Sequence, residues 1–214
     1  MKFRFYRRKV KDGHFRVAIF GSARIKRNDK NYKMIQKLAE MIGERNMDVV
    51  TGGGPGIMEA ANKGHKKGGK HNVHSFGLLI RLPREQMTNK GLDVKRDFNR
   101  FSKRLDEFMR LSNAVVVAPG GIGTLLELVY AWQLLQVKHI QQIPIIVIGE
   151  EWKKLIEWIE RYPLKRKYID KRDLELVFPV NTIDEAMRII NLTYEFYLRD
   201  HKQIVKKMQR EKRK

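Results

Sequence analysis

Three glycine-rich segments of this 214-residue chain have the composition of phosphate-binding turns. They are FGSAR at 20–24, TGGGPGIMEA at 51–60 and APGGIGTLLE at 118–127, and each lies between a short apolar run and a segment of helical periodicity. Glycine lets the backbone approach a ligand closely, and the free N–H groups at the start of a helix favour an anion. The sequence therefore predicts a phosphate site built from these turns.

Other ligands of glycine turns are disfavoured, because their motifs are missing. The turn after the first apolar run, Gly21-Ser22-Ala23-Arg24, is not G-x-G-x-x-G, and no G-x-x-x-x-G-K-[ST] motif is present. The second run ends in Thr51-Gly52, where a dinucleotide-binding protein has an acid. The chain has no cysteine, and its six histidines are scattered, so we expect no metal site and histidines at the surface.

Bringing the three turns together requires a parallel sheet, and the sequence has the pattern of one. Short apolar runs alternate with longer helical segments, which predicts a doubly wound, Rossmann-like α/β domain with helices on both faces of a mostly parallel sheet. The expected strands are 15–20, 47–50, 73–80, 114–118 and 144–148, with 176–180 as a sixth candidate. The expected helices are 30–45, 56–68, 99–112, 124–138, 151–161 and 183–198. In such a sheet, turns at the carboxyl ends of the strands share one edge.

Local patterns add three finer expectations. The helix at 99–112 carries an apolar stripe that predicts a buried face, formed by Phe101, Leu105, Phe108 and Leu111. The sequence TIDE at 182–185 predicts that Thr182 caps the last long helix. The connection at 81–98 is long and basic, and loops of that length are commonly functional.

The formal net charge of +21 is concentrated at the two ends of the chain. Residues 1–12 hold six Lys or Arg and one Asp, and residues 199–214 hold eight Lys or Arg and two acids. We therefore expect a basic N-terminal arm at 1–12, a nucleotide-binding domain at 13–198 and a basic helical tail at 199–214. Solvated tails are the favoured interpretation, and nucleic-acid binding through them is the alternative. The absence of a long apolar stretch or signal peptide predicts a soluble, cytoplasmic protein without membrane contact.

The motifs also resemble a known family, LOG (LONELY GUY), whose members are described as lysine decarboxylase-like. The matching segments are GGGPGIMEAANKG at 52–64, PRE at 83–85, Arg104 and PGGIGTLLE at 119–127, within a resemblance over most of residues 15–190. The resemblance implies a doubly wound fold, a homodimer or larger assembly, and no cofactor. It also implies a phosphoribohydrolase that releases ribose 5-phosphate and a free base from cytokinin-type nucleotides or AMP.

Carried over by position, the resemblance assigns catalysis to Arg104 and Glu127 and a substrate contact to Glu85. It assigns phosphate binding to Gly121, Gly123 and Thr124. The remaining residues that we expect around the ligand are Ser22, Gly53, Gly54, Pro55, Gly56, Gly120 and Ile122. Two positions depart from the family pattern, because Leu105 replaces a lysine and Gln133 replaces a threonine, which affects the expected base preference and rate.

Each of these residues also has a purely structural interpretation. Thr124 and Glu127 match a capping box, in which the glutamate bonds back to the start of its helix. Arg104 fits an exposed, salt-bridging arginine. Ser22 fits a cap of the first helix, and Glu59 fits a partner of its helix dipole.

The function expected from the sequence is hydrolysis of the N-glycosidic bond of a nucleoside 5′-monophosphate, either AMP or an N6-modified AMP. The phosphate is expected on residues 120–124 and the ribose over residues 53–56. The alternative is a non-catalytic binder or carrier of a phosphorylated nucleotide or cofactor, similar to the molybdenum-cofactor carriers.

Overall fold

The computed structural model of the protein describes residues 14–69, 72–81 and 87–211. Seven strands form one sheet in the order β4-β3-β2-β1-β5-β6-β7, and every neighbouring pair is parallel. The strands are β1 Arg16–Phe20, β2 Asp48–Thr51, β3 Ser75–Ile80, β4 Val94–Phe98, β5 Ala114–Val117, β6 Ile145–Ile148 and β7 Val177–Val180. The predicted doubly wound parallel sheet is confirmed.

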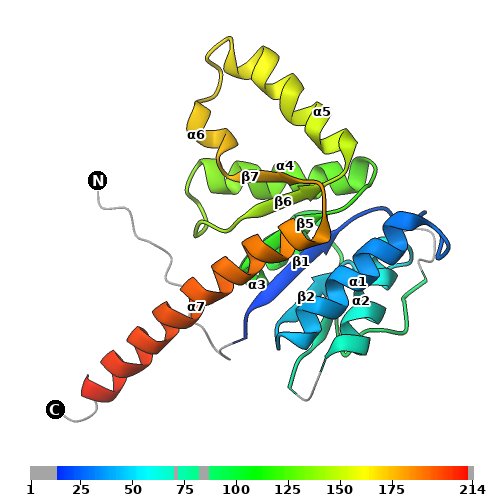
Figure 1. Ribbon diagram of the computed structural model, residues 1–214, viewed down its shortest axis with the longest axis vertical. Helices are drawn as coiled ribbons and strands as arrows, with labels where there is room; N and C mark the ends of the chain where they lie inside the picture. The colour runs from blue at the N-terminus through cyan, green and yellow to red at the C-terminus, as the bar shows by residue number, and fades with distance from the viewer. Residues whose placement is uncertain (1–13, 70–71, 82–86, 212–214) are drawn as a thin grey trace.

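Helices cover both faces of the sheet (Figure 1). They are α1 Lys30–Glu44, α2 Ile57–Gly68, α3 Phe101–Leu111, α4 Ile122–Gln136, α5 Glu150–Ile159, the π-helical turn η1 Glu160–Leu164, α6 Lys171–Leu174 and α7 Ile183–Glu211. Val17 and Ile19 of β1 pack in one core with α1, α2 and α7, whereas Ala18 and Phe20 pack in a second core with α3, α4 and α5. Because successive side chains of a strand point to opposite faces, β1 is buried throughout and its sequence is continuously apolar after Arg16.

The strand order reverses between β1 and β5. From β1 the chain builds outward through β2, β3 and β4, and then returns to β5 on the other side of β1 and continues to β6 and β7. Ligands of doubly wound sheets bind outside the carboxyl ends of the strands at such a reversal. The turns that follow β1 and β5 are two of the three glycine segments, so the topology brings them to the expected place.

One strand was missed by the sequence analysis. β4 lies within residues 81–98, which were expected to form a long loop, and it pairs with β3 from Phe76↔Val94 to Ile80↔Phe98. Its sequence, VKRDF, has three exposed residues in the middle because β4 is an edge strand with one neighbour. A polar edge strand lacks the apolar run that identified the buried strands, which explains the wrong prediction.

The helix predictions are confirmed to within a few residues, with three corrections. Phe101 is 50% exposed, so the apolar stripe of α3 is buried only at Leu105, Phe108 and Leu111. The short elements η1 and α6 were not predicted. The helix expected at 183–198 continues without a break to Glu211.

The predicted cap of α7 is confirmed in part. The Thr182 hydroxyl accepts a hydrogen bond from the Glu185 N–H at 3.2 Å. The Glu185 carboxylate, however, accepts from the Asn181 N–H at 2.7 Å, one residue before the position that a capping box requires.

His65 contradicts the expectation of surface histidines. It is 1% exposed in α2, its Nε2 lies 2.9 Å from the Met47 carbonyl oxygen, and its Nδ1 has no hydrogen-bond partner among the described residues. Burial lowers the pKa of His65, because a charged imidazolium loses its solvation there. His65 is thus a neutral core residue that ties α2 to the start of β2.

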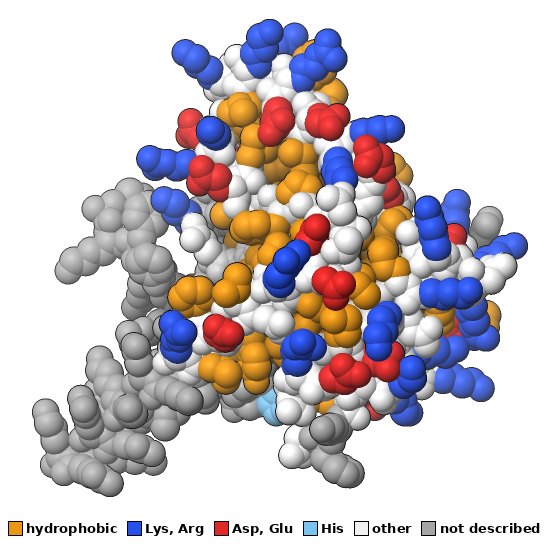
Figure 2. Space-filling model, viewed as in Figure 1, with side chains coloured by type: hydrophobic (Ala, Val, Ile, Leu, Met, Phe, Trp, Pro, Cys, Tyr) orange, Lys and Arg blue, Asp and Glu red, His pale blue; other side chains and the backbone are white. Residues whose placement is uncertain are grey.

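The face of the protein in Figure 2 carries Lys and Arg side chains interspersed with Asp and Glu, and the Lys and Arg side chains gather most densely at the right of the view, over α1 and α2. Residues 1–12, the predicted basic arm, lie outside the described residues. Among the described helices, none combines the length and apolarity needed to cross a membrane. The division into arm, domain and tail stays a prediction.

Candidate active site

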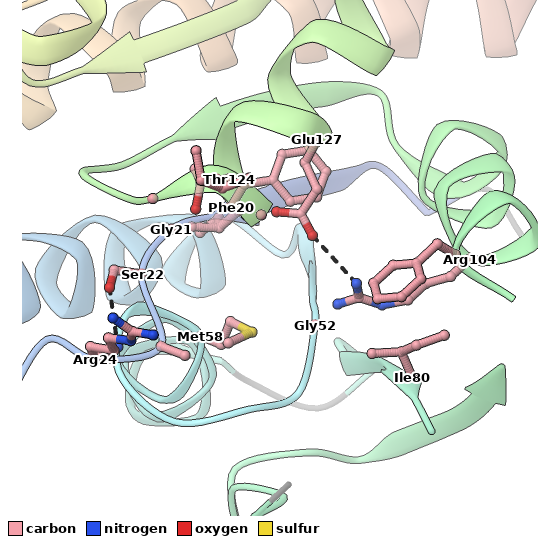
Figure 3. A pocket seen from close by; sticks show the side chains of 16 residues that line it. Phe20, Gly21, Ser22, Arg24, Gly52, Met58, Ile80, Arg104, Thr124 and Glu127 are labelled. Atoms are coloured by element: carbon pink, nitrogen blue, oxygen red, sulfur yellow. Dashed lines mark hydrogen bonds and ion pairs between the residues drawn. The ribbon is translucent and has the colours of Figure 1, made fainter. Parts of the chain in front are cut away.

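The turn after β1 connects the other two glycine segments. The Ser22 N–H donates to the Pro119 carbonyl oxygen at 3.0 Å, and the Ser22 carbonyl oxygen accepts from the Ile57 N–H at 2.9 Å. A cavity of about 500 Å³ opens beside this turn, bordered by residues from β1, α2, β3, α3 and α4. The structure thus gathers the ends of distant segments around one pocket, shown in Figure 3.

Arg104 of α3 and Glu127 of α4 point toward each other at one side of this pocket (Figure 3). The Arg104 Nη1 lies 3.5 Å from the Glu127 Oε1, and the two side chains are 10% and 13% exposed. The Arg104 Nε donates to the Leu78 carbonyl oxygen at 2.7 Å, and its guanidinium lies 5.2 Å from the centre of the Phe108 ring. Three contacts therefore fix the arginine, which in turn holds the carboxylate towards the cavity.

Burial shifts the pKa of both side chains of this pair. Burial raises the pKa of Glu127 to about 7, and the neighbouring Arg104 charge counteracts part of that rise. Burial also lowers the pKa of Arg104, with Glu127 opposing the change. A carboxyl group that titrates near neutral pH can accept and release a proton under ordinary conditions, as general acid–base catalysis requires.

The structural interpretations of these two residues are wrong. Helix α4 begins at Ile122 after the N-cap Gly121, so Thr124 lies inside the first turn and Glu127 belongs to no capping box. Arg104 is 8% exposed rather than a surface arginine. Neither residue is explained by helix capping or by a solvent-exposed ion pair.

Two further structural interpretations have different outcomes. Ser22 does not cap the first helix, because the Asp29 side chain accepts from the Asn31 N–H at 2.7 Å at the start of α1. Glu59 does lie in the first turn of α2, and its carboxylate pairs with Arg27 at 2.7 Å and Lys63 at 2.9 Å. The Arg27 hydrogen bond is the largest effect that lowers the pKa of Glu59 to about 2.

The start of α4 is open to the pocket. None of the described side chains caps this helix, and a Cβ added at Gly121 or at Gly123 would have no described atom within 4 Å. Gly121, Ile122, Gly123 and Thr124 all border the cavity. The uncapped N–H groups and the helix dipole make this turn suitable for an anion such as a phosphate group.

The second glycine segment contributes less to the cavity surface than expected. Between β2 and α2 only Gly52 borders the pocket, and the expected ligand contacts Gly53, Gly54, Pro55 and Gly56 do not. A Cβ at Gly52 would lie 2.3 Å from the Arg104 Nη2, so glycine is needed there for Arg104 to keep its place. This loop therefore mainly leaves room for the Arg104 guanidinium.

Seven of the predicted site residues border the cavity: Ser22, Arg104, Gly121, Ile122, Gly123, Thr124 and Glu127. Gly120 does not, because it packs on the Thr124 side chain. Glu85 lies outside the described residues. The functional roles of these residues stay predictions.

Nine residues that border the cavity were not predicted as site residues, and four of them have large side chains from outside β1. Arg24 lies beside Ser22, and Met58, Ile80 and Phe101 form apolar parts of the wall. Arg24 belongs to the first glycine turn, so its charge was a usable signal.

The two departures from the family pattern lie outside the pocket. Leu105 is 5% exposed, Gln133 is exposed, and neither side chain borders the cavity.

A histidine and aspartate cluster lies at the opposite edge of the sheet, at the starts of the central strands. Ligand atoms of His14, Asp48 and His74 lie within 4.8 Å of one another. The sequence gave no sign of this cluster, because its members are far apart in the chain. The Asp48 carboxylate already accepts from the Arg16 Nε at 3.2 Å and from the His74 N–H at 2.8 Å. An arginine in contact with the carboxylate opposes a cation, so the cluster fits a structural ion pair better than a metal site.

Comparison with known families and structures agrees with this description. A family model described as "Possible lysine decarboxylase" matches residues 58–190, more than half of the chain. The fold is similar to that of a molybdenum cofactor binding protein from Rippkaea orientalis, with a TM-score of 0.64 and 18% identity over 83% of this chain and 96% of that one. It is also similar to the Moco carrier protein of Chlamydomonas reinhardtii, with a TM-score of 0.59 and 19% identity over 85% and 98% of the two chains. At these identities the likeness concerns the fold.

Two curated relatives are more similar in sequence. The pyrimidine/purine nucleotide 5′-monophosphate nucleosidase of Escherichia coli (strain K12) is 29% identical over 133 residues, which are 57% of this chain and 28% of that protein. This chain therefore spans less than a third of that relative. The probable cytokinin riboside 5′-monophosphate phosphoribohydrolase LOGL6 of Oryza sativa subsp. japonica is 27% identical over 203 residues, which are 93% of this chain and 78% of that protein.

Proposed function

The chain belongs to the possible lysine decarboxylase family, which is of LOG type, and we propose that it hydrolyses the N-glycosidic bond of nucleoside 5′-monophosphates. Water adds to the anomeric carbon of the ribose, the bond to the base breaks, and the base leaves with a proton. The products are a free base and ribose 5-phosphate. AMP, or AMP with a substituent on N6, is the proposed substrate.

The observation that carries the proposal is the placement of the Arg104–Glu127 pair beyond the open start of α4. From Gly123 to Glu127 the helix rises about 6 Å, at about 1.5 Å per residue. A phosphate on the free N–H groups would therefore place the ribose alongside the Glu127 carboxylate, with its anomeric carbon at the far end. The apolar wall of Met58, Ile80 and Phe101 would then receive the base.

Glu127 and Arg104 have separate roles in this proposal. Breaking the N-glycosidic bond builds positive charge on the sugar ring, and a carboxylate beside the ring stabilises that charge and takes a proton from the attacking water. The pKa of about 7 leaves a large fraction of Glu127 ionised at neutral pH. Arg104, held by the Leu78 carbonyl oxygen, keeps this carboxylate in place.

The rival function is a carrier that binds a phosphorylated nucleotide or cofactor without cleaving it. A carrier has no need for a buried carboxyl group that titrates near neutral pH beside its anion site, because the negative charge would oppose binding. Hydrolysis does need such a group. A phosphorylated ligand that co-purifies intact, without turnover of any nucleoside monophosphate, would select the carrier.

Incubation with AMP, followed by chromatography of adenine and ribose 5-phosphate, tests the proposal directly. We expect equal amounts of both products from the unaltered protein and at least about 100-fold less from Glu127→Gln, which keeps the shape and removes the charge. Glu107→Gln is the matched control, since Glu107 is a similarly buried acid on α3 that pairs with Arg96 and Arg110 away from the pocket. Equal activity in Glu127→Gln and the control would exclude the proposed mechanism.

A homodimer also stays a proposal, supported by one exposed side of α4. Ile122, Leu126, Val129 and Val137 recur on one side of this helix and are 82%, 42%, 42% and 56% exposed. This apolar side adjoins the pocket at Ile122, so a second copy of the chain covering it would also cover the pocket rim. Light scattering should give twice the chain mass for the unaltered protein and the single mass for Leu126→Glu. A single mass for both would contradict the proposal.

A further inference from the structure

We propose that Arg24 binds the phosphate group of the substrate and makes the pocket select nucleotides over nucleosides. This inference rests on the proposed function and adds a residue that neither the sequence motifs nor the helix start supplies. Arg24 borders the cavity beside Ser22, on the side opposite Arg104 (Figure 3).

The charges of the pocket require a further cation. A phosphate monoester carries a charge between about −1.5 and −2 at neutral pH. The ionisable side chains that border the described pocket are Arg24, Arg104 and Glu127. Arg104 is held by Glu127 and by the Leu78 carbonyl oxygen, so its charge offsets the carboxylate. Arg24 is the remaining cation, and without it the phosphate would be bound beside a carboxylate with no positive side chain of its own.

Arg24 is also available for a ligand. Its side chain is exposed, and it has no ion-pair partner among the described residues. The nearby Arg27, by contrast, is engaged by Glu59 through two hydrogen bonds at 3.2 Å and 2.7 Å. A guanidinium that can contact two phosphate oxygens at once forms strong and directional hydrogen bonds.

The backbone of the turn holds Arg24 in position. The Arg24 N–H donates to the Ser22 Oγ at 3.1 Å, and Ser22 itself is fixed to Pro119 and Ile57 by backbone hydrogen bonds. Because the Ser22 hydroxyl accepts from Arg24, its own proton remains free to be donated to a phosphate oxygen. Ser22, Arg24 and the start of α4 then surround the anion from three sides.

The experiment compares Arg24→Gln with Lys26→Gln. Both changes remove one positive charge, and Lys26 is exposed two residues away without bordering the pocket, so it controls for the general field of the protein. We expect the KM for AMP to rise about 10-fold or more in Arg24→Gln and to stay unchanged in Lys26→Gln, because a hydrogen bond to a charged group is lost only in the first. Turnover of adenosine, which lacks the phosphate, should be equally low in the unaltered protein and in Arg24→Gln.

Three outcomes decide the inference. A selective rise of the KM for AMP in Arg24→Gln supports it, and an equal KM in both variants overturns it while leaving the proposed function intact. If the unaltered protein cleaves no nucleotide, the proposed function fails, and calorimetry with ribose 5-phosphate decides the role of Arg24 instead. Binding that weakens about 10-fold in Arg24→Gln alone would support the phosphate contact, whereas equal binding, or none by the unaltered protein, would overturn it.

Discussion

The two richest glycine turns of this protein have similar sequences and opposite surroundings. Both follow a buried parallel strand and lead into a helix, β2 to α2 and β5 to α4. At Gly52 and Gly56 an added Cβ would meet another atom at 2.3 Å, whereas at Gly121 and Gly123 it would meet none within 4 Å. The first turn is packed at both positions, and the second is packed at Gly120 but open at Gly121 and Gly123.

The same residue type therefore serves two purposes. In the first turn glycine makes room for neighbours that must come close, namely the Arg104 guanidinium and the Ser22 carbonyl oxygen. In the second it leaves the backbone uncovered for a ligand. If this comparison holds, equal substitutions in the two turns should have unequal effects, and four predictions follow in order of size.

Gly52→Ala should have the largest effect on activity. Its methyl group would push the Arg104 Nη2 from its place, and a catalytic group displaced by about 1 Å can lose about 100-fold in rate. Stability should change little, since the displaced atom is the end of a side chain. The measurement is kcat/KM on AMP together with thermal unfolding. Full activity in this variant would show that Arg104 does not need the support of the first turn.

The pH dependence of kcat/KM should also depend on how the first turn positions Arg104 beside Glu127. Glu127 must be ionised to accept a proton, and its pKa is about 7, so activity should rise up to that pH and fall about tenfold for each unit below it. Because Arg104 lowers the pKa of Glu127, Gly52→Ala should move the rise to higher pH. A profile that is flat between pH 5 and 8 would contradict the role of Glu127.

Gly56→Ala should mainly reduce stability. Gly56 has φ +67° and its Cβ would lie 2.3 Å from the Ser22 carbonyl oxygen, so both the backbone conformation and the packing oppose a side chain. We expect a loss of about 1–3 kcal/mol in the free energy of unfolding, measured with denaturant. An unchanged unfolding midpoint would mean that the first turn relaxes easily.

Gly123→Ala should have the smallest effect on stability and still disturb the ligand. Position 123 is helical and unobstructed, so alanine should leave the unfolding free energy unchanged or raise it by up to about 1 kcal/mol. The added methyl group would face the proposed phosphate, so the KM for AMP should rise a few-fold. Destabilisation comparable to that of Gly56→Ala would remove the distinction between the two turns.

Much of the fold was predictable from local sequence. The strands with short apolar runs were located from the sequence, and six of the seven, the candidate at 176–180 included, agree with the structure within two residues at each end. β4 was not predictable in this way, since an edge strand with polar residues looks like a loop. The prediction that Phe101 is buried was wrong for a related reason. Helical spacing places Phe101 on an apolar stripe but does not show that the stripe ends at a cavity.

The candidate site was predictable in its residues more than in its arrangement. The motifs identified Arg104, Glu127 and the α4 turn, all of which border the pocket. They also placed the ribose over residues 53–56, although none of these residues borders the cavity and only the preceding Gly52 does. Arg24 was not assigned to the pocket although it lies in the first glycine turn, because local sequence does not show which way its side chain faces.

The sequence by itself determined the parallel sheet, the helices on both faces and the family, because these depend on periodicity and on motifs between near neighbours in the chain. Only the tertiary structure decided that Arg104 is buried, that Glu127 titrates near neutral pH and that one glycine turn is packed while the other is open. Burial, electrostatic shifts and open space arise between residues that are distant in the chain, such as Gly52, Leu78, Arg104 and Glu127. The contacts between these residues form only when the chain folds.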